Sequence, residues 1–456
     1  MPFKQEEIVN YLKRYGFIFA NSEIYGGLAN AWDYGPLGIL LKRNIKSLWW
    51  KEFVTKNPEA VGLDSSILNN NAVWKASGHL SNFSDPLIDC KHCHNRFRAD
   101  KLIEEQVKNA SISENTPFNE LERIIKEHNI KCPVCGNVDW TSIRKFNLMF
   151  KTHQGVLEDD SNVIYLRPET AQGIFINFLN IQRSLRLKLP FAVGQIGKSF
   201  RNEITPGNFI FRTREFEQME LEYFVNPKDA DKVFEDELTK IKSFLLDTIT
   251  LNKKNVNFKE HSKKELSHYS KRTIDIQYNF PHGWSELWGI ANRTDFDLQS
   301  HIKQSKANLW YLDPTNNEKI VPYVIEPSVG VERLLYAIVN DKYEIEKLKD
   351  NDSREVLHLS YELAPYKVGV LPLTNKLNKQ SKKIFNLLVN EGIEATYDAS
   401  GSIGKRYRRQ DAIGTPYCIT YDFDSIDKKT ITIRERDSMK QKRIKIDKLI
   451  EFFNKK

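Results

Sequence analysis

The chain has 456 residues, of which 40% are hydrophobic and 28% charged. This composition is typical of a globular protein with a large core, and the length predicts two or three domains. No stretch approaches the roughly 20 apolar residues that cross a bilayer, and the N-terminus lacks the apolar segment of a signal peptide, so we expect a cytoplasmic protein with no membrane partner.

The net charge of +8 is unevenly distributed. Residues 366–456 carry 20 Lys+Arg and 11 Asp+Glu, whereas residues 1–365 carry 48 and 49. A basic tail on a near-neutral body favours a polyanionic partner such as nucleic acid, although a lysine-rich solvated surface would show the same excess.

Four of the five cysteines form two CxxC pairs, Cys90/Cys93 and Cys132/Cys135. In a chain without a secretion signal, such pairs indicate zinc rather than disulfides. The gap between the pairs is 38 residues, wider than the roughly 15 to 20 of a compact ribbon. A short helix, predicted from Thr116-Pro117 to about residue 128, can occupy that gap.

We therefore predict a closed, structural zinc site with these four cysteines as thiolate ligands. His92 and His94 are alternative ligands, and four reduced cysteines without a metal are the other interpretation. Cys418 stands apart from the set.

The first 365 residues alternate helical and extended patterns. A Tyr-Gly-Pro-Leu-Gly turn opens a predicted helix over residues 33–53, with an apolar face from Leu37 to Trp49. Residues 163–225 contain three runs typical of strands in an antiparallel sheet, and residues 228–251 have helical periodicity. The polar segment 253–272 is predicted to be an insertion or a long surface connection.

The last ninety or so residues alternate strands and helices, which indicates a small α/β domain with a mixed sheet. Its boundary is expected near residues 363–366, where Pro365 interrupts the pattern. Strands are predicted at 367–373, 394–398, 417–423 and 430–436, and helices at 375–391 and 405–413.

Two constellations carry chemistry. A predicted hairpin brings together Arg201, Glu203, Arg212, Arg214 and Phe216, which could hold phosphates and stack on a base. Such a face is also compatible with plain solvation.

The second constellation is a strand-to-helix turn from Glu326 to Arg333, with small residues before an apolar helix. It could approach a ligand or simply pack closely against another element.

These elements occur in the order found in class II aminoacyl-tRNA synthetases. Residues 33–53 resemble motif one, Phe200 to Phe216 the FRxE strand–loop–strand of motif two, and Ser328 to Arg333 the Gly-rich turn and Arg of motif three. Nearly the whole chain is similar to glycyl-tRNA synthetases of the homodimeric bacterial type, on the blocks YGGLANAWDYGPLG, RPETAQGIF, GQIGKSFRNEI, REFEQMELEYF, ELWGIANRTDFDL and EPSVGVER. The tail resembles the anticodon-binding domain shared with the threonyl, prolyl and histidyl enzymes.

The resemblance implies an α+β catalytic domain of the class II synthetase fold, built on an antiparallel sheet with flanking helices, over residues 1–363. It also implies a zinc-knuckle-like insertion at 85–145 and a C-terminal α/β anticodon-binding domain at 364–456. The implied enzyme is a glycine–tRNA ligase, which forms glycyl-adenylate from glycine and ATP and transfers glycine to the terminal adenosine of glycine tRNA. The implied assembly is a homodimer, with the apolar face of residues 33–53 at the two-fold interface.

For ATP with Mg²⁺, the resemblance implies catalytic roles for Arg201 at the α-phosphate and Arg333 at the γ-phosphate. Glu203 would accept a hydrogen bond from the adenine amino group, Phe216 would stack beneath the ring, and Glu286 would face the nucleotide and its magnesium. A fixed guanidinium stabilises charge that builds at the α-phosphate, so no side chain need act as nucleophile. The other implied ATP-binding residues are Asn202, Phe211, Arg212, Leu287 and Gly330.

For glycine, the resemblance implies a cluster of carboxylates around the substrate ammonium, formed by Glu169, Glu220 and Glu326 with Ser328 beside them. Carboxylates packed against the α-carbon leave no room for a side chain, so steric exclusion can provide specificity without an editing site. Three further residues near the substrate carboxylate or these acids complete the implied glycine-binding site, namely Arg98, Gln218 and Arg293.

Ser328 replaces the usual Gly of motif three, which is typical of glycyl enzymes. Gly207, after Thr205-Pro206, replaces a basic residue of some relatives and would remove one contact with the tRNA acceptor end. The tail residues implied to contact the tRNA backbone are Lys405, Arg406, Arg408 and Arg409, with Arg434 and Arg436 nearby; a solvated helix face is the alternative.

Two rival assignments are considered. A prolyl or threonyl enzyme would share the architecture, but the three-carboxylate pocket and the lack of a Cys/His zinc set in the catalytic core disfavour it. A catalytically silent relative that only binds RNA or DNA would be expected to lose Arg201, Glu203 or Arg333, and all three are present.

Overall fold

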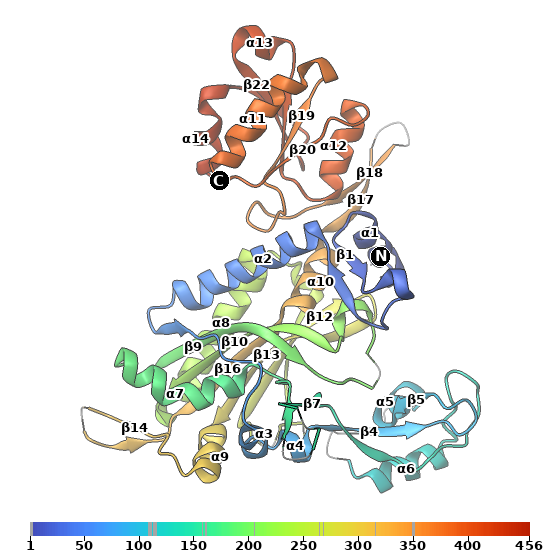
Figure 1. Cartoon of the computed structure of the whole chain (residues 1–456), viewed down its shortest axis with the longest axis vertical. Coiled ribbons are helices and arrows are strands. Elements are labelled where there is room, and N and C mark those ends of the chain that lie inside the picture. Colours follow the sequence, from blue (N-terminus) through green and yellow to red (C-terminus); the bar gives the residue numbers. More distant parts are fainter. Residues whose placement is uncertain are drawn as a thin grey trace.

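The computed structural model describes residues 3–107, 112, 116–156, 158–159, 162–204, 206–263, 265–267, 269–314, 316–348 and 352–456. Figure 1 shows a large body that contains the N-terminus and a smaller body that contains the C-terminus. The hairpin of β17 (Tyr343–Lys347) and β18 (Ser353–Leu357) lies between them.

A seven-stranded sheet forms the centre of the large body, in the order β11-β12-β13-β16-β10-β9-β3. Neighbouring strands are antiparallel, except that β3 runs parallel to β9 at one edge. The strands are β3 (Ala60–Gly62), β9 (Phe191–Phe200), β10 (Glu215–Val225), β11 (Val256–Glu260), β12 (Arg272–Phe280), β13 (Gly283–Thr294) and β16 (Tyr323–Gly330).

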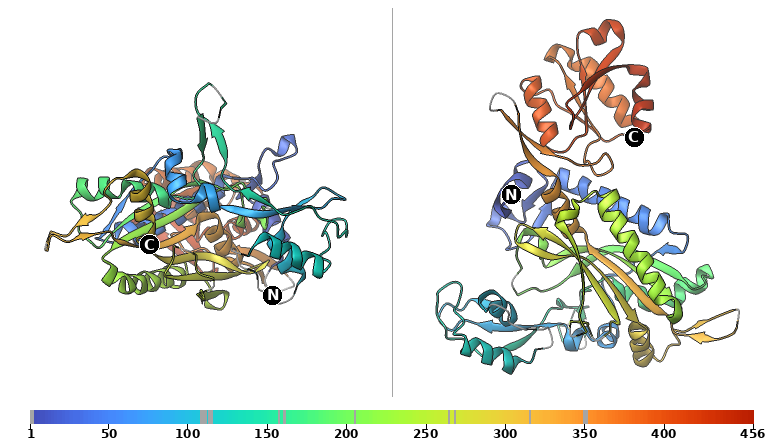
Figure 2. Two further views of the ribbon diagram at one scale, coloured as in Figure 1. Left: turned by 90° about the horizontal axis from the view of Figure 1, so that it is seen from below. Right: turned by 180° about the vertical axis from the view of Figure 1, so that it is seen from behind.

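The two faces of this sheet enter different layers, because side chains alternate along each strand. Met219, Leu221 and Tyr223 of β10 join a core with α2, α8 and α10, whereas Phe224 joins a second core with α7 and α9. Figure 2 shows the helices around the sheet from two further directions. These helices are α2 (Pro36–Trp50), α7 (Ala171–Leu185), α8 (Ala230–Ser243), α9 (Phe296–Ser305) and α10 (Val331–Lys342).

The apolar face of α2 packs against its own chain. Leu41, Ile45 and Trp49 are completely buried in the main core, and a Cβ atom at Gly38 would lie 1.9 Å from the carbonyl oxygen of Phe17. The interpretation that this face forms a two-fold interface is therefore wrong, because the face already covers the sheet. Only the opposite side of α2 remains at the surface.

Other elements refine the sequence-based predictions. Residues 163–165 form β8 (Val163–Tyr165) in a separate hairpin with β7 (Lys151–His153), and α7, which follows, was not predicted. The helix predicted at 228–251 is confirmed as α8 continued by the π-helical turn η6 (Phe244–Thr248). The segment 253–272 is not merely a surface connection, because β11 extends the central sheet.

The insertion contains a three-stranded sheet in the order β5-β4-β6 and two helices with a small core of their own. The helix predicted between the CxxC pairs is confirmed, since it begins directly after Pro117. The elements are β4 (Ser84–Asp89), β5 (Arg96–Arg98), α5 (Ala99–Gln106), α6 (Phe118–Glu127) and β6 (Arg144–Asn147).

The tail forms a five-stranded mixed sheet in the order β20-β19-β21-β22-β23, which confirms the prediction. β19 is parallel to β20 and β21, and the β21–β22 and β22–β23 pairs are antiparallel. Its elements are β19 (Val368–Pro372), α11 (Asn378–Asn390), β20 (Ala395–Tyr397), α12 (Ile403–Ala412), β21 (Tyr417–Tyr421), α13 (Asp424–Lys428), β22 (Thr430–Glu435), β23 (Gln441–Lys445) and α14 (Leu449–Asn454).

Short elements complete the large body. Their bounds are α1 (Gln5–Arg14), β1 (Ile18–Ala20), β2 (Trp32–Tyr34), α3 (Asn71–Ala76), α4 (His79–Asn82), β14 (Tyr311–Leu312) and β15 (Lys319–Ile320).

Within the described residues, no helix combines the length and apolarity needed to cross a bilayer.

Candidate active site

Arg201 lies directly after β9, where its guanidinium is held from several sides. Its backbone N–H donates to the carbonyl of Arg214 across the hairpin at 2.9 Å, and its Nε donates to the carbonyl of Pro168 at 3.0 Å. The guanidinium carbon lies 5.3 Å from the ring centroids of both Phe83 and Phe216. Arg201 and Phe216, predicted to meet on this hairpin, are therefore in contact.

Glu203 is 9% exposed, and its Oε2 atom has no hydrogen-bond partner among the described residues. The nearest cation is Arg212, whose Nη1 lies 3.9 Å from that oxygen. A buried carboxylate oxygen without a donor costs free energy unless a ligand supplies one. Asn202, between Arg201 and Glu203, donates its backbone N–H to the carbonyl of Leu148 at 2.8 Å.

The turn of this hairpin contains the η4 helix (Phe209–Phe211). Thr205 lies outside the described residues. A side chain at Gly207 would meet no atom within 4 Å, so the basic residue of some relatives would fit there.

Arg333 lies in the first turn of α10, as predicted, and spans toward two other elements. Its Nη1 donates to the Oε2 of Glu286 at 3.2 Å and to the carbonyl of Glu286 at 3.0 Å. Its guanidinium carbon stands 4.3 Å above the ring of Phe211. Burial, together with the charges of Arg212 and Arg201, lowers the pKa of Arg333, against the opposite effect of Glu286.

Two further implied nucleotide residues have different surroundings. Gly330 ends β16 and precedes α10, where its absent side chain leaves the first helical turn open. Leu287 is 1% exposed and packs in the main core, so only its backbone remains to face a ligand.

Glu220 is the hydrogen-bonding hub of a buried polar cluster on the α7 side of the sheet. Its Oε1 accepts from Ser328 Oγ at 2.9 Å and from Gln218 Nε2 at 3.1 Å. Its Oε2 accepts from the backbone N–H of Thr170 at 3.1 Å and from the Thr170 hydroxyl. Burial and the charge of Glu169 raise the pKa of Glu220.

Arg293 and Glu326 form the second part of this cluster, with a distance of 2.6 Å from Nη1 to Oε2. The other edge of the guanidinium binds Asp297 through Nε at 2.7 Å and Nη2 at 2.9 Å. Burial raises the pKa of Glu326 to about 8, with the charge of Arg293 opposing this effect and the charges of Glu220 and Glu169 adding to it.

Glu169 forms the third part. Gln172 donates to its Oε1 at 3.0 Å, and His79 Nε2 lies 3.5 Å from its Oε2. Although burial raises it, the charges of His79 and Arg293 hold the pKa of Glu169 well below its usual range. The structure thus brings Glu169, Glu220, Glu326 and Ser328 into one connected cluster, as predicted.

Arg98 is engaged by acids of the insertion. Its guanidinium lies 3.1 Å from Asp85 and 2.7 Å from Asp100. Burial lowers the pKa of Arg98, but the hydrogen bonds and charge of Asp100, together with the charges of Asp85 and Glu203, raise it overall. Burial raises the pKa of Asp85 to about 6, with Arg98 opposing and Glu203 adding to the effect.

Sequence reasoning missed four supporting residues of the acid cluster. His79, Thr170, Gln172 and Asp297 hold the predicted residues; the last three lie within the similar blocks RPETAQGIF and ELWGIANRTDFDL, whereas His79 lies outside every block. It also missed Glu222, for which a signal exists. In Gln218-Met-Glu-Leu-Glu222, every second residue is polar, which places all three polar side chains on one face of a strand.

The four cysteines of the two CxxC pairs converge. Cys90 Sγ lies 3.6 Å from Cys135 Sγ, Cys93 Sγ lies 3.6 Å from Cys132 Sγ, and all four sulfurs are within 4.8 Å of one another. A tetrahedral zinc site with Zn–S bonds of about 2.3 Å needs sulfurs about 3.8 Å apart. The sulfur positions therefore fit zinc.

The two cysteine turns also match each other. The N–H of His94 donates to the carbonyl of Cys90 at 2.9 Å, and that of Gly136 to the carbonyl of Cys132 at 2.8 Å. The side chain of His94, like that of His92, is exposed, and neither belongs to the group of converging atoms.

A second group of potential ligand atoms belongs to Glu344, Glu346 and His358 on the hairpin between the two bodies. It is already occupied by ion pairs, since Arg354 binds Glu346 at 2.6 Å and Asp437 binds His358 Nδ1 at 2.7 Å. We assign no metal to this group.

Three arginines of the tail support its fold. Arg406 is 3% exposed and donates to the carbonyls of Ala399 at 2.8 Å and Gly401 at 2.7 Å. Arg434 and Arg436 are also buried, at 6% and 4% exposure.

The other cations predicted to contact RNA are more accessible. Arg408 pairs with Asp352 and Arg409 with Asp398, each at 2.6 Å, and their side chains are 38% and 41% exposed. Lys405 is exposed.

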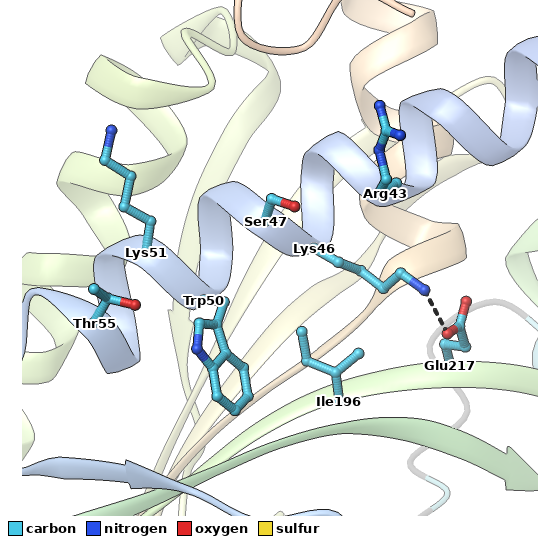
Figure 3. Close-up of a pocket in the computed structure, with 8 residues that line it drawn as sticks. All are labelled: Arg43, Lys46, Ser47, Trp50, Lys51, Thr55, Ile196 and Glu217. Carbon is cyan, nitrogen blue, oxygen red and sulfur yellow. Dashed lines mark hydrogen bonds and ion pairs between the residues drawn. The ribbon is translucent and has the colours of Figure 1, made fainter. Parts of the chain in front are cut away.

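A pocket of about 470 Å³ lies on the other face of the sheet, beside α2 (Figure 3). Lys46 donates to Glu217 of β10 at 2.8 Å across it, and Trp50 and Ile196 form its apolar wall. Because Glu217 and Gln218 are adjacent on a strand, this pocket and the acid cluster lie on opposite faces.

Three family profiles match the chain. Residues 150–342 match the family described as tRNA synthetase class II core domain (G, H, P, S and T), and residues 367–456 match the anticodon binding domain. Residues 85–117 and 108–148 match the glycyl-tRNA synthetase insertion domain 1.

Curated relatives are similar over almost their full length. A glycine–tRNA ligase from Ureaplasma urealyticum is 61% identical over 99% of this chain and 96% of its own. Those from Malacoplasma penetrans and Clostridium acetobutylicum are 62% and 56% identical, over 97% and 99% of this chain and 95% and 98% of their own.

A solved structure shares the fold. It is the prolyl-tRNA synthetase of Cryptosporidium parvum, determined with L-proline and AMP, which aligns with a TM-score of 0.62 and 14% identity over 98% of this chain and 74% of its own. The class II fold predicted from the sequence is thus confirmed, and the chain belongs to the glycine–tRNA ligase family of class II aminoacyl-tRNA synthetases.

Proposed function

We propose that this chain joins glycine to its tRNA, with the aminoacyl-adenylate lying along β10. The observation that carries this proposal is the order of side chains on one face of that strand. Phe216 lies at one end beside Arg201, and Glu220 lies four residues further along. Four strand residues span about 13 Å, a length suited to an extended glycyl-adenylate.

In the first step, a glycine carboxylate oxygen attacks the α-phosphorus of ATP and the bond to the β-phosphate breaks, which releases pyrophosphate. Arg201 stabilises the charge that builds on the α-phosphate, and Arg333 binds the γ-phosphate. Glu203 accepts a hydrogen bond from the adenine amino group through Oε2, which has no hydrogen-bond donor among the described residues. The remaining nucleotide contacts are proposed for Asn202, Phe211, Arg212, Phe216, Glu286, Leu287 and Gly330.

The glycine ammonium is proposed to bind between Glu169, Glu220 and Glu326, near Ser328. The hydrogen bonds of Thr170, Gln218 and Ser328 already hold Glu220, so its carboxylate is oriented before substrate arrives. The tight packing of these acids leaves glycine as the amino acid that fits. Gln218 and Arg293 position the acids, and Arg98 is proposed to face the substrate from the insertion.

In the second step, a ribose hydroxyl of the terminal adenosine of glycine tRNA attacks the glycyl carbonyl and AMP leaves. We propose residues 1–363 as the catalytic domain, 85–145 as its insertion and 364–456 as the anticodon-binding domain. Lys405, Arg408 and Arg409 are the tail cations proposed to face the RNA backbone, while Arg406 holds the preceding loop.

Two metals complete the proposal. Magnesium bound with ATP would neutralise phosphate charge, and Glu286, whose side chain is 49% exposed beside Arg333, is the residue that would face it. One structural zinc is proposed for Cys90, Cys93, Cys132 and Cys135, where it would tie the two cysteine turns together.

The proposed assembly is a homodimer that works in the cytoplasm, where translation uses its product. Its interface would include the outward side of α2 and the pocket beside it, since Arg43, Ser47 and Trp50 remain there at the surface.

The test is ATP–pyrophosphate exchange with each amino acid in turn, followed by charging of glycine tRNA. We expect exchange with glycine and not with alanine, proline or threonine. Exchange with proline or threonine alone would replace the proposal with another class II activity, and exchange with none would indicate a catalytically silent relative.

A further inference from the structure

Glu222 is a buried acid beside the proposed glycine site, with no partner. It is 0% exposed, and neither carboxyl oxygen has a hydrogen-bond partner among the described residues. Arg293, the neighbouring cation, donates to Asp297 and Glu326 instead. An ionised carboxylate in this position would lose its hydration without gaining a donor, which is costly.

The strand register places Glu222 opposite Glu326. Glu220 pairs with Ser328 and Tyr223 with Ile325, so Glu222 and Glu326 face each other between these pairs on β10 and β16. Because the side chains of Glu220 and Ser328 meet on one face, those of Glu222 and Glu326, two residues further along each strand, meet on the same face.

Two carboxyl groups that face each other in a buried site share at least one proton. Burial and the charge of Glu326 raise the pKa of Glu222 well above its usual range, with Arg293 opposing this effect. A neutral Glu222 has one O–H donor, and the Glu326 carboxylate is an acceptor within the same cluster.

We propose that Glu222 is a positioning residue of the glycine site: as a neutral acid it donates a hydrogen bond to the carboxylate that Glu326 carries when glycine is bound, and it holds this carboxylate, together with Arg293, toward the substrate ammonium. This inference rests on the proposed role of Glu326. It assigns Glu222 no contact with glycine, so its effect reaches the substrate only through Glu326.

The experiment compares Glu222→Gln, which keeps the volume and a donor, with Glu222→Met, which keeps the volume and removes the donor. The matched control is Glu237→Met on α8, another acid at 2% exposure with an unpartnered oxygen. Each purified full-length variant is assayed by glycine-dependent ATP–pyrophosphate exchange, with its Tm measured alongside.

We expect the glycine KM of Glu222→Gln to stay within about threefold of the parent. That of Glu222→Met should rise about 10- to 100-fold, the value of a hydrogen bond to a charged group, with kcat and the ATP KM changed far less. Glu237→Met should keep the parental glycine KM. An unchanged KM in Glu222→Met, or equal defects in Met and Gln variants, would overturn the inference.

An infrared difference spectrum between the parent and Glu222→Gln, recorded near neutral pH, tests the protonation directly. We expect the parent to show the carbonyl absorption of the protonated Glu222 acid and the variant to lose that contribution. Absence of that difference band overturns the inference. Because the spectrum does not depend on the exchange assay, this outcome is distinct from failure of the proposed function, which would show as no exchange with any amino acid.

Discussion

Lys42 of α2 and Glu332 of α10 form a buried ion pair, with 2.7 Å between Nζ and Oε1. The same ammonium lies 2.6 Å from Glu217 of β10, and Glu332 also accepts the backbone N–H of Glu217 at 2.9 Å. Glu332 immediately precedes Arg333. The pair thus links α2, β10 and the first turn of α10, which contains Arg333.

Lys42→Met should therefore affect both stability and activity. Removing Lys42 leaves Glu332 buried without its cation, which costs about 3 to 5 kcal/mol, whereas Glu217 keeps its ion pair with Lys46. The free energy of unfolding in urea and the ATP KM measure the two effects. Lys46→Met is the control, because Lys46 binds the same Glu217 but is 26% exposed, and such a pair contributes only about 0 to 1 kcal/mol. Equal losses in both variants would contradict this account.

Arg201→Lys should lower kcat of adenylate formation by about 10²- to 10³-fold, the effect of removing one preorganised donor. A lysine keeps the charge but loses the planar fork that reaches from Pro168 to the phosphate. Single-turnover formation of glycyl-adenylate measures this step. Arg214→Lys on the same hairpin, whose side chain donates within the described residues only to the Ala29 carbonyl at 3.5 Å, should remain within about threefold of the parent in kcat. A parental rate in Arg201→Lys would exclude the proposed role.

Glycine binding should strengthen as the pH rises toward 8. The pKa of Glu326 is raised to about 8 by burial, so below that pH the free site holds a proton that the substrate ammonium displaces. The affinity can rise by at most about tenfold per pH unit and then level off. The folded-state pKa of Glu326 lies above its value in the unfolded chain. The free energy of unfolding of the ligand-free protein should therefore fall progressively as the pH rises from about 4.5 to about 8.

Calorimetry in buffers of different ionisation enthalpy, with glycine and a non-reactive ATP analogue, measures the released proton. Glu326→Gln should bind glycine more weakly and lose most of the pH dependence. An affinity that stays flat from pH 6.5 to about 8 in the parent would speak against a protonated Glu326.

Elemental analysis of the purified protein should find one zinc per chain. Cys132→Ser should lose the metal, lower the Tm and increase hydrogen exchange in the insertion, because the ion closes the two cysteine turns. Cys418→Ser is a matched control, since Cys418 is 1% exposed and Cys132 2% exposed. A zinc content that is unchanged in Cys132→Ser would exclude this site.

The resemblance of the sequence blocks to class II synthetases was sufficient to predict the class II fold and the acids that meet near Ser328. Strand periodicity fixes which residues of β10 share a face, and the glycine-rich turn fixes Arg333 in the first turn of α10. The partners of these residues could not be predicted. His79 reaches the cluster through tertiary packing, which leaves no spacing to read, whereas Thr170 is adjacent to Glu169 and Asp297 follows Arg293 by four residues.

In the tail, the sequence did not show which basic residues are buried. Arg406 and Arg434 contribute to the same basic excess as Lys405, yet they are buried, and Arg434 binds Asp411 at 2.7 Å. A charge count cannot separate an arginine that holds a loop from one that meets solvent. The residues 253–272 were misjudged for a related reason, because an edge strand with polar side chains resembles a surface loop.

The row of Gln218, Glu220 and Glu222 on β10 has an evolutionary consequence. A central strand is most stable with apolar residues on a buried face, and substitutions that neutralise this row should make the fold more resistant to heat while abolishing glycine recognition. Selection for thermal tolerance must therefore act elsewhere in the chain. We expect stabilising changes to accumulate on the α2 side of the sheet, where Met219, Leu221 and Val225 of the same strand are already apolar.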